Sequence, residues 1–140
     1  MEQGTDLKQI TKQISMKQIR LYAEASGDFN PIHVDEEYAR KSHYGQNIAH
    51  GMMVAASISE IMTSSFGSAW HSTGKMKIRF RAPVFPGDMI TATGHVKEIT
   101  ETNRGSEIRC TIAVTRQTGE VAISGATSIT VSSQMPTNTD

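Results

Sequence analysis

Residues 48–67 read IAHGMMVAASISEIMTSSFG, and this stretch decides the fold. Apolar and small residues recur in it at intervals of three and four, a spacing that places side chains on one face of a helix. Gly67 is suited to end such a helix. We therefore expect a long helix buried on one face. Its predicted buried stripe is Ile48, Met52, Ala55, Ala56, Ser59, Met62 and Phe66.

The sequence after Trp70 changes to a period of two, which is typical of strands with one buried face. Ile99 falls out of step with the residues before it, which indicates a bulge. The segments 81–88 (RAPVFPGD) and 116–120 (RQTGE) carry turn residues. Helices followed by long antiparallel strands predict an α+β domain with the long helix across a sheet. The alternating residues are Met76, Ile78, Phe80, Ile90, Ala92, Gly94, Val96, Ile108, Cys110, Ile112, Val114, Val121, Ile123, Ile129 and Val131.

The first part of the chain predicts shorter elements. Residues 7–15 (LKQITKQIS) fit either a weak strand or an irregular lead-in. Ser15 and Gln18 fit a capping box, in which each side chain satisfies a free backbone N–H group. A helix is therefore expected over 16–26, and Gly27 is suited to end it.

The segment after this helix contains a proline that restricts its backbone. Because Asn30 precedes Pro31, we expect residues 27–33 to be extended or turning. A second, short helix is expected over 36–41, with Asp35 as its N-cap.

Size and composition exclude several classes of protein. The chain has 140 residues, a formal net charge of zero and one cysteine. We expect one domain over 1–140, ordered over about 6–133 and flexible over 134–140. The balanced charge lacks the basic excess of nucleic-acid-binding proteins, and neither a signal peptide nor a membrane-spanning run is found. A cytoplasmic protein is expected, without nucleic-acid or membrane partners, and with Cys110 in its core.

A carboxylate and an imidazole stand close together in GDFNPIHVD (27–35). Asp28 could be a simple turn residue, but Asp28 and His33 could also hold one water and transfer its protons. Gly51, at the start of the long helix, offers an N–H group without an intrahelical partner, where the helix dipole adds positive character. A metal site is not expected, because no second histidine or carboxylate stands at a usual ligand spacing. His50 is expected to shape the start of the helix.

Two stretches together resemble the MaoC-like family of (R)-specific enoyl-CoA hydratases: YAEASGDFNPIHVDEEYAR (22–40) and IAHGMMVAASIS (48–59). The resemblance implies a hot-dog fold, in which a curved antiparallel sheet wraps a long central helix. It also implies a double hot-dog dimer, with each active site near the subunit interface. The implied reaction is reversible syn hydration of a trans-2-enoyl thioester to the (R)-3-hydroxyacyl thioester. No cofactor is implied beyond the coenzyme A or acyl carrier protein that carries the substrate.

The resemblance also assigns roles to residues. Asp28 and His33 correspond to the catalytic pair, and Gly51 to the glycine whose N–H contacts the thioester oxygen. Ser59 corresponds to a serine beside the pair. Its hydroxyl is expected to face inward and to need a partner, although a small residue there could serve packing alone. Asn30 is assigned to shaping the turn.

A row of cations alternates along one predicted strand: Lys75, Lys77, Arg79 and Arg81. Such a row is either a solvated strand face or a surface for the phosphates of coenzyme A or for an acidic carrier protein.

Three rival functions are compatible with the same fold. The nearest is a 3-hydroxyacyl-carrier-protein dehydratase that uses the same catalytic pair. A hot-dog thioesterase would carry its carboxylate on or next to the long helix, where Glu60 is the only acid. A non-catalytic subunit that binds acyl chains would have no need of Asp28 and His33.

Overall fold

The computed structural model describes residues 1–132, so the tail predicted at 134–140 lies outside the described residues. In chain order the helices are α1 (Met16–Ser26), α2 (Pro31–Val34), α3 (Glu36–Arg40), α4 (Gly51–Phe66) and α5 (Ser68–Thr73). The strands are β1 (Ile10–Gln13), β2 (Lys75–Phe80), β3 (Met89–Thr102), β4 (Gly105–Arg116) and β5 (Val121–Val131). They form one antiparallel sheet in the order β1-β3-β4-β5-β2.

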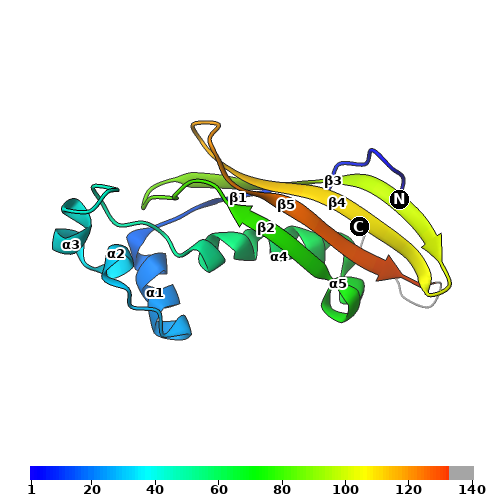
Figure 1. The fold of residues 1–140 in the computed structure, drawn as a ribbon, viewed down its shortest axis with the longest axis horizontal. Coiled ribbons are helices and arrows are strands. Elements are labelled where there is room, and N and C mark those ends of the chain that lie inside the picture. Colours follow the sequence, from blue (N-terminus) through cyan, green and yellow to red (C-terminus); the bar gives the residue numbers. More distant parts are fainter. Residues whose placement is uncertain (133–140) are drawn as a thin grey trace.

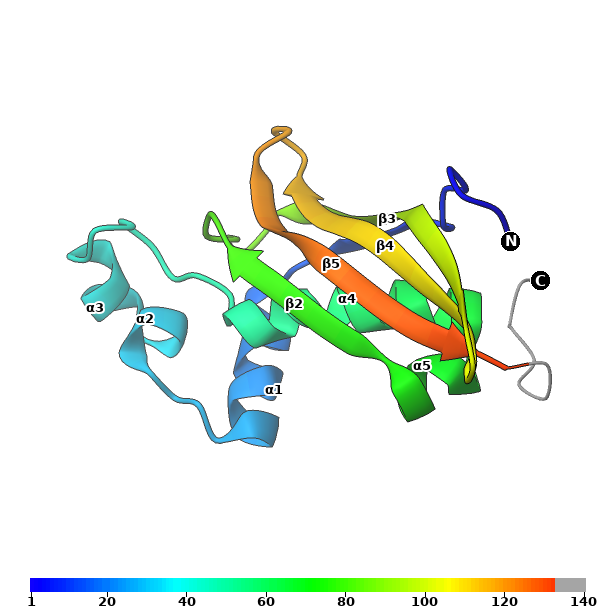
Figure 2. The same ribbon diagram turned by 45° about the vertical axis from the view of Figure 1, so that its right-hand side comes forward.

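The sheet is curved, and α4 lies along its inner face (Figure 1). The 45° view of Figure 2 agrees, and both views place α1, α2 and α3 together beyond the N-terminal end of α4. The predicted α+β arrangement is therefore confirmed. Within residues 1–132, no helix has the length and apolar character that crossing a membrane would require.

The hydrophobic core lies between α4 and the sheet, and the predicted stripe on α4 is right only in part. Ala55, Met62 and Phe66 are buried, as predicted. Met52 is 58% exposed and Ala56 is exposed, whereas Ile58 and Ile61 are fully buried. Met52, Met53 and Val54 are all apolar, so the spacing alone fitted more than one face. The buried α4 residues are Val54, Ala55, Ser57, Ile58, Ile61, Met62, Ser65 and Phe66.

The predictions for α1 are confirmed. Ser15 Oγ accepts from Gln18 N at 3.1 Å, and Gln18 Oε1 accepts from Ser15 N at 2.9 Å, which completes the capping box. Gly27 ends the helix with a φ of 78°, a left-handed conformation that favours glycine.

Two predictions for the segments around the helices need correction. Residues 31–34 form the short helix α2, because Pro31 suits the first position of a helix and Asn30 caps it through a side-chain oxygen 3.1 Å from Ile32 N. Residues 70–73 belong to α5, which the period-two pattern did not predict, and the strand starts only at Lys75.

Most of the strand predictions hold, but Phe80, placed on the buried face by the alternation, is 52% exposed. The weak candidate at the N-terminus is the strand β1, paired with β3. The register of β3 against β4 shifts between Val96 and Glu98, which confirms the bulge that Ile99 indicated. Cys110 on β4 is buried, as predicted, and burial raises the pKa of its thiol to about 11.

The connection between β2 and β3 is held by a buried ion pair. Asp88 is 4% exposed and accepts from Arg116 Nε at 2.7 Å, Arg116 Nη2 at 3.1 Å and Gln117 Nε2 at 2.8 Å. Its Oδ2 also accepts from Phe85 N at 2.8 Å. The segment 81–88 is therefore fixed against the β4–β5 turn, and the turn signals of the sequence did not reveal this network.

Candidate active site

The predicted catalytic pair lies where α1, α2 and the start of α4 meet. Gly27 turns the chain out of α1, and Asp28 follows at once. Asp28 Oδ1 accepts from Asn30 N at 3.2 Å, and Asn30 in turn caps α2, which carries His33. Two successive side-chain-to-backbone bonds thus define the path between the two groups.

Asp28, His33 and His50 form one cluster. One carboxylate oxygen and one ring nitrogen from each histidine lie within 4.8 Å of one another. Because a hydrogen bond to water spans about 2.8 Å, one water can bridge the Asp28 carboxylate and the His33 ring. The structure therefore brings together the carboxylate and imidazole that the sequence singled out.

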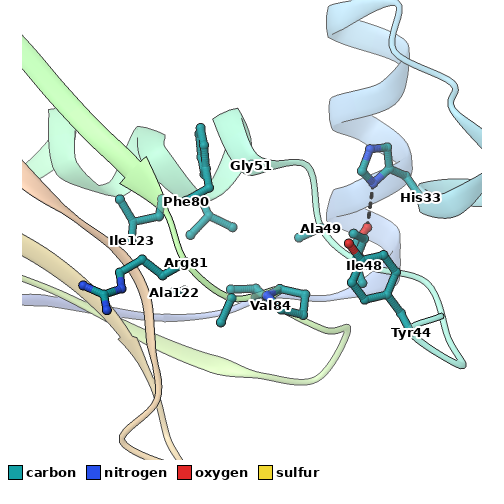
Figure 3. Close-up of a pocket in the computed structure, with 13 residues that line it drawn as sticks. His33, Tyr44, Ile48, Ala49, Gly51, Phe80, Arg81, Val84, Ala122 and Ile123 are labelled. Carbon is teal, nitrogen blue, oxygen red and sulfur yellow. Dashed lines mark hydrogen bonds between the residues drawn. The ribbon is translucent and has the colours of Figure 1, made fainter.

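A backbone contact defines the proton position on His33. Its Nδ1 lies 2.8 Å from the carbonyl oxygen of Ile48, a contact drawn in Figure 3. A carbonyl only accepts, so Nδ1 carries the proton. In the neutral ring Nε2 then bears a lone pair and can accept a proton.

His50 has contacts that the sequence did not reveal. It stands at the N-cap position of α4, as predicted, but its side chain makes no capping bond there. Its ring is 2% exposed and stacks on His33 with centroids 3.8 Å apart and planes 25° apart. Its Nε2 lies 2.9 Å from the backbone oxygen of Asp28, so this nitrogen donates. The only sequence signal was a histidine directly before the glycine that starts the helix.

The same cluster is poorly shaped for a metal ion. The lone pair of an imidazole nitrogen lies in the plane of its ring, and a metal sits about 2.0–2.1 Å along it. The rings of His33 and His50 are stacked at 3.8 Å with planes only 25° apart, so their lone pairs do not converge on one point. His50 Nε2 is also engaged with Asp28. The grouping of three ligand-type residues thus fits proton transfer better than metal binding.

A cavity of about 280 Å³ opens beside the cluster (Figure 3). His33, Tyr44 and Gly51 line it together with mostly apolar residues. A chamber of this kind can hold the apolar part of a small ligand next to polar groups at one end. The other lining residues are Ile48, Ala49, Val54, Phe80, Arg81, Ala82, Pro83, Val84, Ala122 and Ile123.

Gly51 is the first residue of α4 and lines this cavity. The N–H groups of a first helical turn have no intrahelical partner and carry the positive end of the helix dipole. A Cβ at this position would lie 2.8 Å from Cε1 of Phe80. A glycine is therefore the residue that lets the Phe80 ring close on the start of the helix.

Ser59 lies further along α4 than Gly51. It is half-buried, and it stands eight residues after Gly51, about 12 Å further along the helix. It does not line the cavity, and within residues 1–132 it makes no hydrogen bond to Asp28 or His33. Its supporting role remains a prediction.

The cationic row lies on the edge strand β2 and just beyond it. Lys75, Lys77 and Arg79 are exposed, and none forms an ion pair within the described part of the chain. Arg81 lines the cavity, and its Nη1 lies 3.5 Å from Ser124 Oγ. The row thus leads from open surface to the mouth of the site.

Comparison with known proteins agrees with this geometry. The family model described as the MaoC like domain matches residues 1–120. The chain is 34% identical to the (R)-specific enoyl-CoA hydratase of Rhodospirillum rubrum over 87% of this chain and 83% of the relative. It is 32% identical to the 3-hydroxybutyryl-CoA dehydratase of Methylorubrum extorquens, over 75% and 67% of the two chains.

A solved structure shares the fold. The (R)-hydratase from A. caviae involved in PHA biosynthesis superposes with a TM-score of 0.81 at 25% identity. The match covers 94% of this chain and 97% of that chain. The expected hot-dog fold is therefore confirmed.

Proposed function

This chain belongs to the MaoC-like domain family, and from that premise we propose that it is a hydro-lyase acting on acyl thioesters. Its reaction is the reversible hydration of a trans-2-enoyl-CoA to the (R)-3-hydroxyacyl-CoA. The observation that carries this proposal is the cluster of Asp28 and His33, within 4.8 Å, whose His33 lines a mostly apolar cavity of about 280 Å³.

The pair is suited to hold the attacking water. His33 Nε2 bears a lone pair, because Nδ1 donates to Ile48. Asp28 is exposed, and within residues 1–132 its Oδ2 accepts no hydrogen bond. A water that donates one O–H to each acceptor points an oxygen lone pair away from both, toward C3 of a bound enoyl group.

The hydration step then balances without a cofactor. One acceptor takes a proton from the water as the oxygen bonds to C3, and the C2–C3 π electrons move toward the thioester carbonyl. The enolate collapses when the same proton returns to C2. Both additions come from the side of the pair, so the hydration is syn, and dehydration runs the same steps backwards.

The charge that develops on the thioester oxygen needs a donor, and we assign this role to the N–H of Gly51. It lies at the positive end of α4 and beside the cavity. A preorganised donor of this kind typically contributes about 2.7–4 kcal/mol to transition-state stabilisation. The apolar wall that includes Val54 and Val84 would receive the acyl chain.

Positively charged side chains near the cavity are suited to bind the carrier of the thioester. Arg81 stands at the cavity, and the cations of β2 extend from it along the sheet edge. These side chains suit the phosphates of coenzyme A. The row from residue 75 to 81 spans about 20 Å of strand, which also suits an acidic carrier protein. A 3-hydroxyacyl-carrier-protein dehydratase is therefore the second candidate.

The other rivals fit the geometry less well. Glu60, the one acid on α4, forms an ion pair with Lys12 and does not line the cavity, which argues against a thioesterase that uses it. A non-catalytic acyl-binding subunit would not require the assembled cluster of Asp28 and His33.

We also expect a homodimer. The edge strand β2 leaves one row of backbone groups unpaired. Phe80, which lines the cavity, and Met52, next to Gly51, are 52% and 58% exposed, so they offer apolar surface that a second subunit could cover.

The test is direct. Purified protein is mixed with crotonyl-CoA, loss of the enoyl-thioester absorbance is followed, and the enantiomer of the product is determined. We expect turnover to (R)-3-hydroxybutyryl-CoA. Absence of turnover with both coenzyme A and carrier-protein thioesters would rule the proposal out.

A second arm of the experiment tests the role of charge in binding the carrier. Arg81→Glu is compared with Arg104→Glu, a charge reversal in the β3–β4 turn, away from the cavity. We expect Arg81→Glu to raise KM several-fold at low salt, with the difference shrinking as salt screens the charges. An unchanged KM at low salt for both carriers would show that Arg81, the member of the row at the cavity, has no part in binding.

A further inference from the structure

The buried histidine beside the pair has no assigned role, and its contacts reach both catalytic groups. We propose that His50 is a positioning residue that holds Asp28 through a hydrogen bond and His33 through ring stacking. The inference deepens the proposed function and rests on it, because it concerns the geometry of the same pair.

The segment that carries Asp28 has little else to hold it. Residues 24–31 are all exposed, so no buried side chain of this segment anchors it. His50 Nε2 donates to the backbone oxygen of Asp28 at 2.9 Å, across 22 residues of sequence. This bond ties the exposed segment to the rigid start of α4. Without it, the position of the carboxylate would depend on local turn bonds alone.

The ring of His50 also limits the ring of His33. The two centroids are 3.8 Å apart and the planes differ by 25°. Tyr22 packs on His50 at 4.7 Å, which supports the stack from α1. A stacked neighbour fixes the plane of the His33 ring, and the Nδ1 contact to Ile48 fixes its rotation. Together they determine where Nε2 points.

A role in packing alone does not explain the residue. Because Nε2 donates, the neutral ring has a lone pair on Nδ1, and this buried atom has no partner within the described residues. A buried polar atom without a partner destabilises the folded state. An apolar ring would fill the space without that cost. What histidine adds here is an N–H group at Nε2 on a flat ring, and these are the two features that touch Asp28 and His33.

Three substitutions separate the two features. His50→Gln keeps an N–H donor at a similar reach and loses the ring. His50→Phe keeps the ring and loses the donor, and His50→Ala loses both. His71→Ala, an exposed histidine on α5 outside the site, is the matched control.

The assay measures kcat and KM with crotonyl-CoA, alongside the melting temperature. We expect His50→Ala to lower kcat about 100-fold, the typical effect of displacing a catalytic group by about 1 Å, with KM within about 3-fold. His50→Gln and His50→Phe should each recover part of that loss, and His71→Ala should match the wild type.

The proposal is overturned if folded His50→Ala keeps kcat within about 3-fold, or if both partial variants lose as much kcat as His50→Ala. Should His50→Ala not fold, the two partial variants still decide, because each must fall below the wild type.

A second measurement does not depend on activity. Nitrogen NMR of the imidazole rings reports which nitrogen of His33 carries the proton. We expect one Nδ1–H form in the wild type and in His71→Ala. In His50→Gln the lost stack no longer holds the His33 ring in the plane of its bond to Ile48, so that bond weakens and a mixture of forms is expected. An unchanged single form in His50→Gln would disprove the stacking role. If the wild type turns over no thioester, the proposed function fails. The NMR measurement still tests whether His50 positions the ring of His33.

Discussion

The chain contains the same dipeptide at two turns, and the two aspartates have opposite uses. Gly27 and Gly87 both adopt a positive φ, 78° and 94°, and each is followed by an aspartate. Asp88 is buried and accepts four hydrogen bonds. Asp28 is exposed and, within residues 1–132, its carboxylate accepts one, from Asn30 N.

The difference lies in what surrounds each turn. Asp88 faces Arg116 across the β4–β5 turn, so its charge is neutralised and its oxygens are occupied. Asp28 sits beside His50 and beside His33, which lines the cavity, with an oxygen free for a water. A carboxylate whose oxygens are all hydrogen-bonded stabilises the fold. A carboxylate with an oxygen left without a hydrogen bond remains available for chemistry.

The largest effect is expected when the available carboxylate is removed. Asp28→Asn keeps the shape of the side chain but not its basicity. We expect kcat to fall about 1,000-fold, within the usual range for loss of a general acid or base, while the melting temperature stays near that of the wild type. His33→Gln should act similarly. Near-normal kcat in either variant would mean that the pair is not catalytic.

The converse substitution tests the other aspartate. Asp88→Asn leaves Arg116 without its buried partner, and breaking a buried ion pair typically costs about 3–5 kcal/mol. We expect the free energy of unfolding, measured by urea titration, to fall by about 3 kcal/mol. In folded Asp88→Asn at 10 °C we expect kcat to remain within a few-fold of the wild type. A large loss of kcat with unchanged stability would reverse the assignment of the two aspartates.

The local features of the fold could be predicted from the sequence because their causes are local. The capping box at Ser15 and the glycine at 27 each act within one helical turn, and both hold. The bulge near Ile99 appeared as a slip in the alternation. By contrast, the buried face of α4 was predicted only in part, because three consecutive apolar residues, 52–54, left the face at the start of the helix undetermined.

The site was predictable only in part, for the same reason. Asp28 and His33 share one short segment, and the segment has the motif of a known family. The contact of His50 with Asp28 spans 22 residues, and that of Arg116 with Asp88 spans 28. No fixed sequence separation predicts either contact, because each depends on how α4 or β4 packs in three dimensions.

The smallest expected effect is on the pH dependence of stability, and it separates the two aspartates again. Burial by itself would raise the pKa of Asp88, but hydrogen bonds from Arg116, the Phe85 N–H and Gln117 outweigh it and lower the pKa below the ordinary 3.8.

In the unfolded chain the Asp88 carboxyl takes up a proton near pH 3.8, while the folded protein resists protonation until a lower pH. The stability that the Asp88 carboxylate contributes is therefore fully present above pH 3.8. It is lost as the pH falls through the lowered pKa of the folded state. Urea titrations of the wild type and Asp88→Asn at several pH values between 7 and 2 measure this contribution. We expect the gap between the two proteins to be constant near neutral pH and to narrow below pH 3.8, whereas the gap between the wild type and Asp28→Asn should stay small throughout. A gap for Asp88→Asn that persists unchanged to pH 2 would show that its ionised carboxylate is not what holds the 81–88 segment in place.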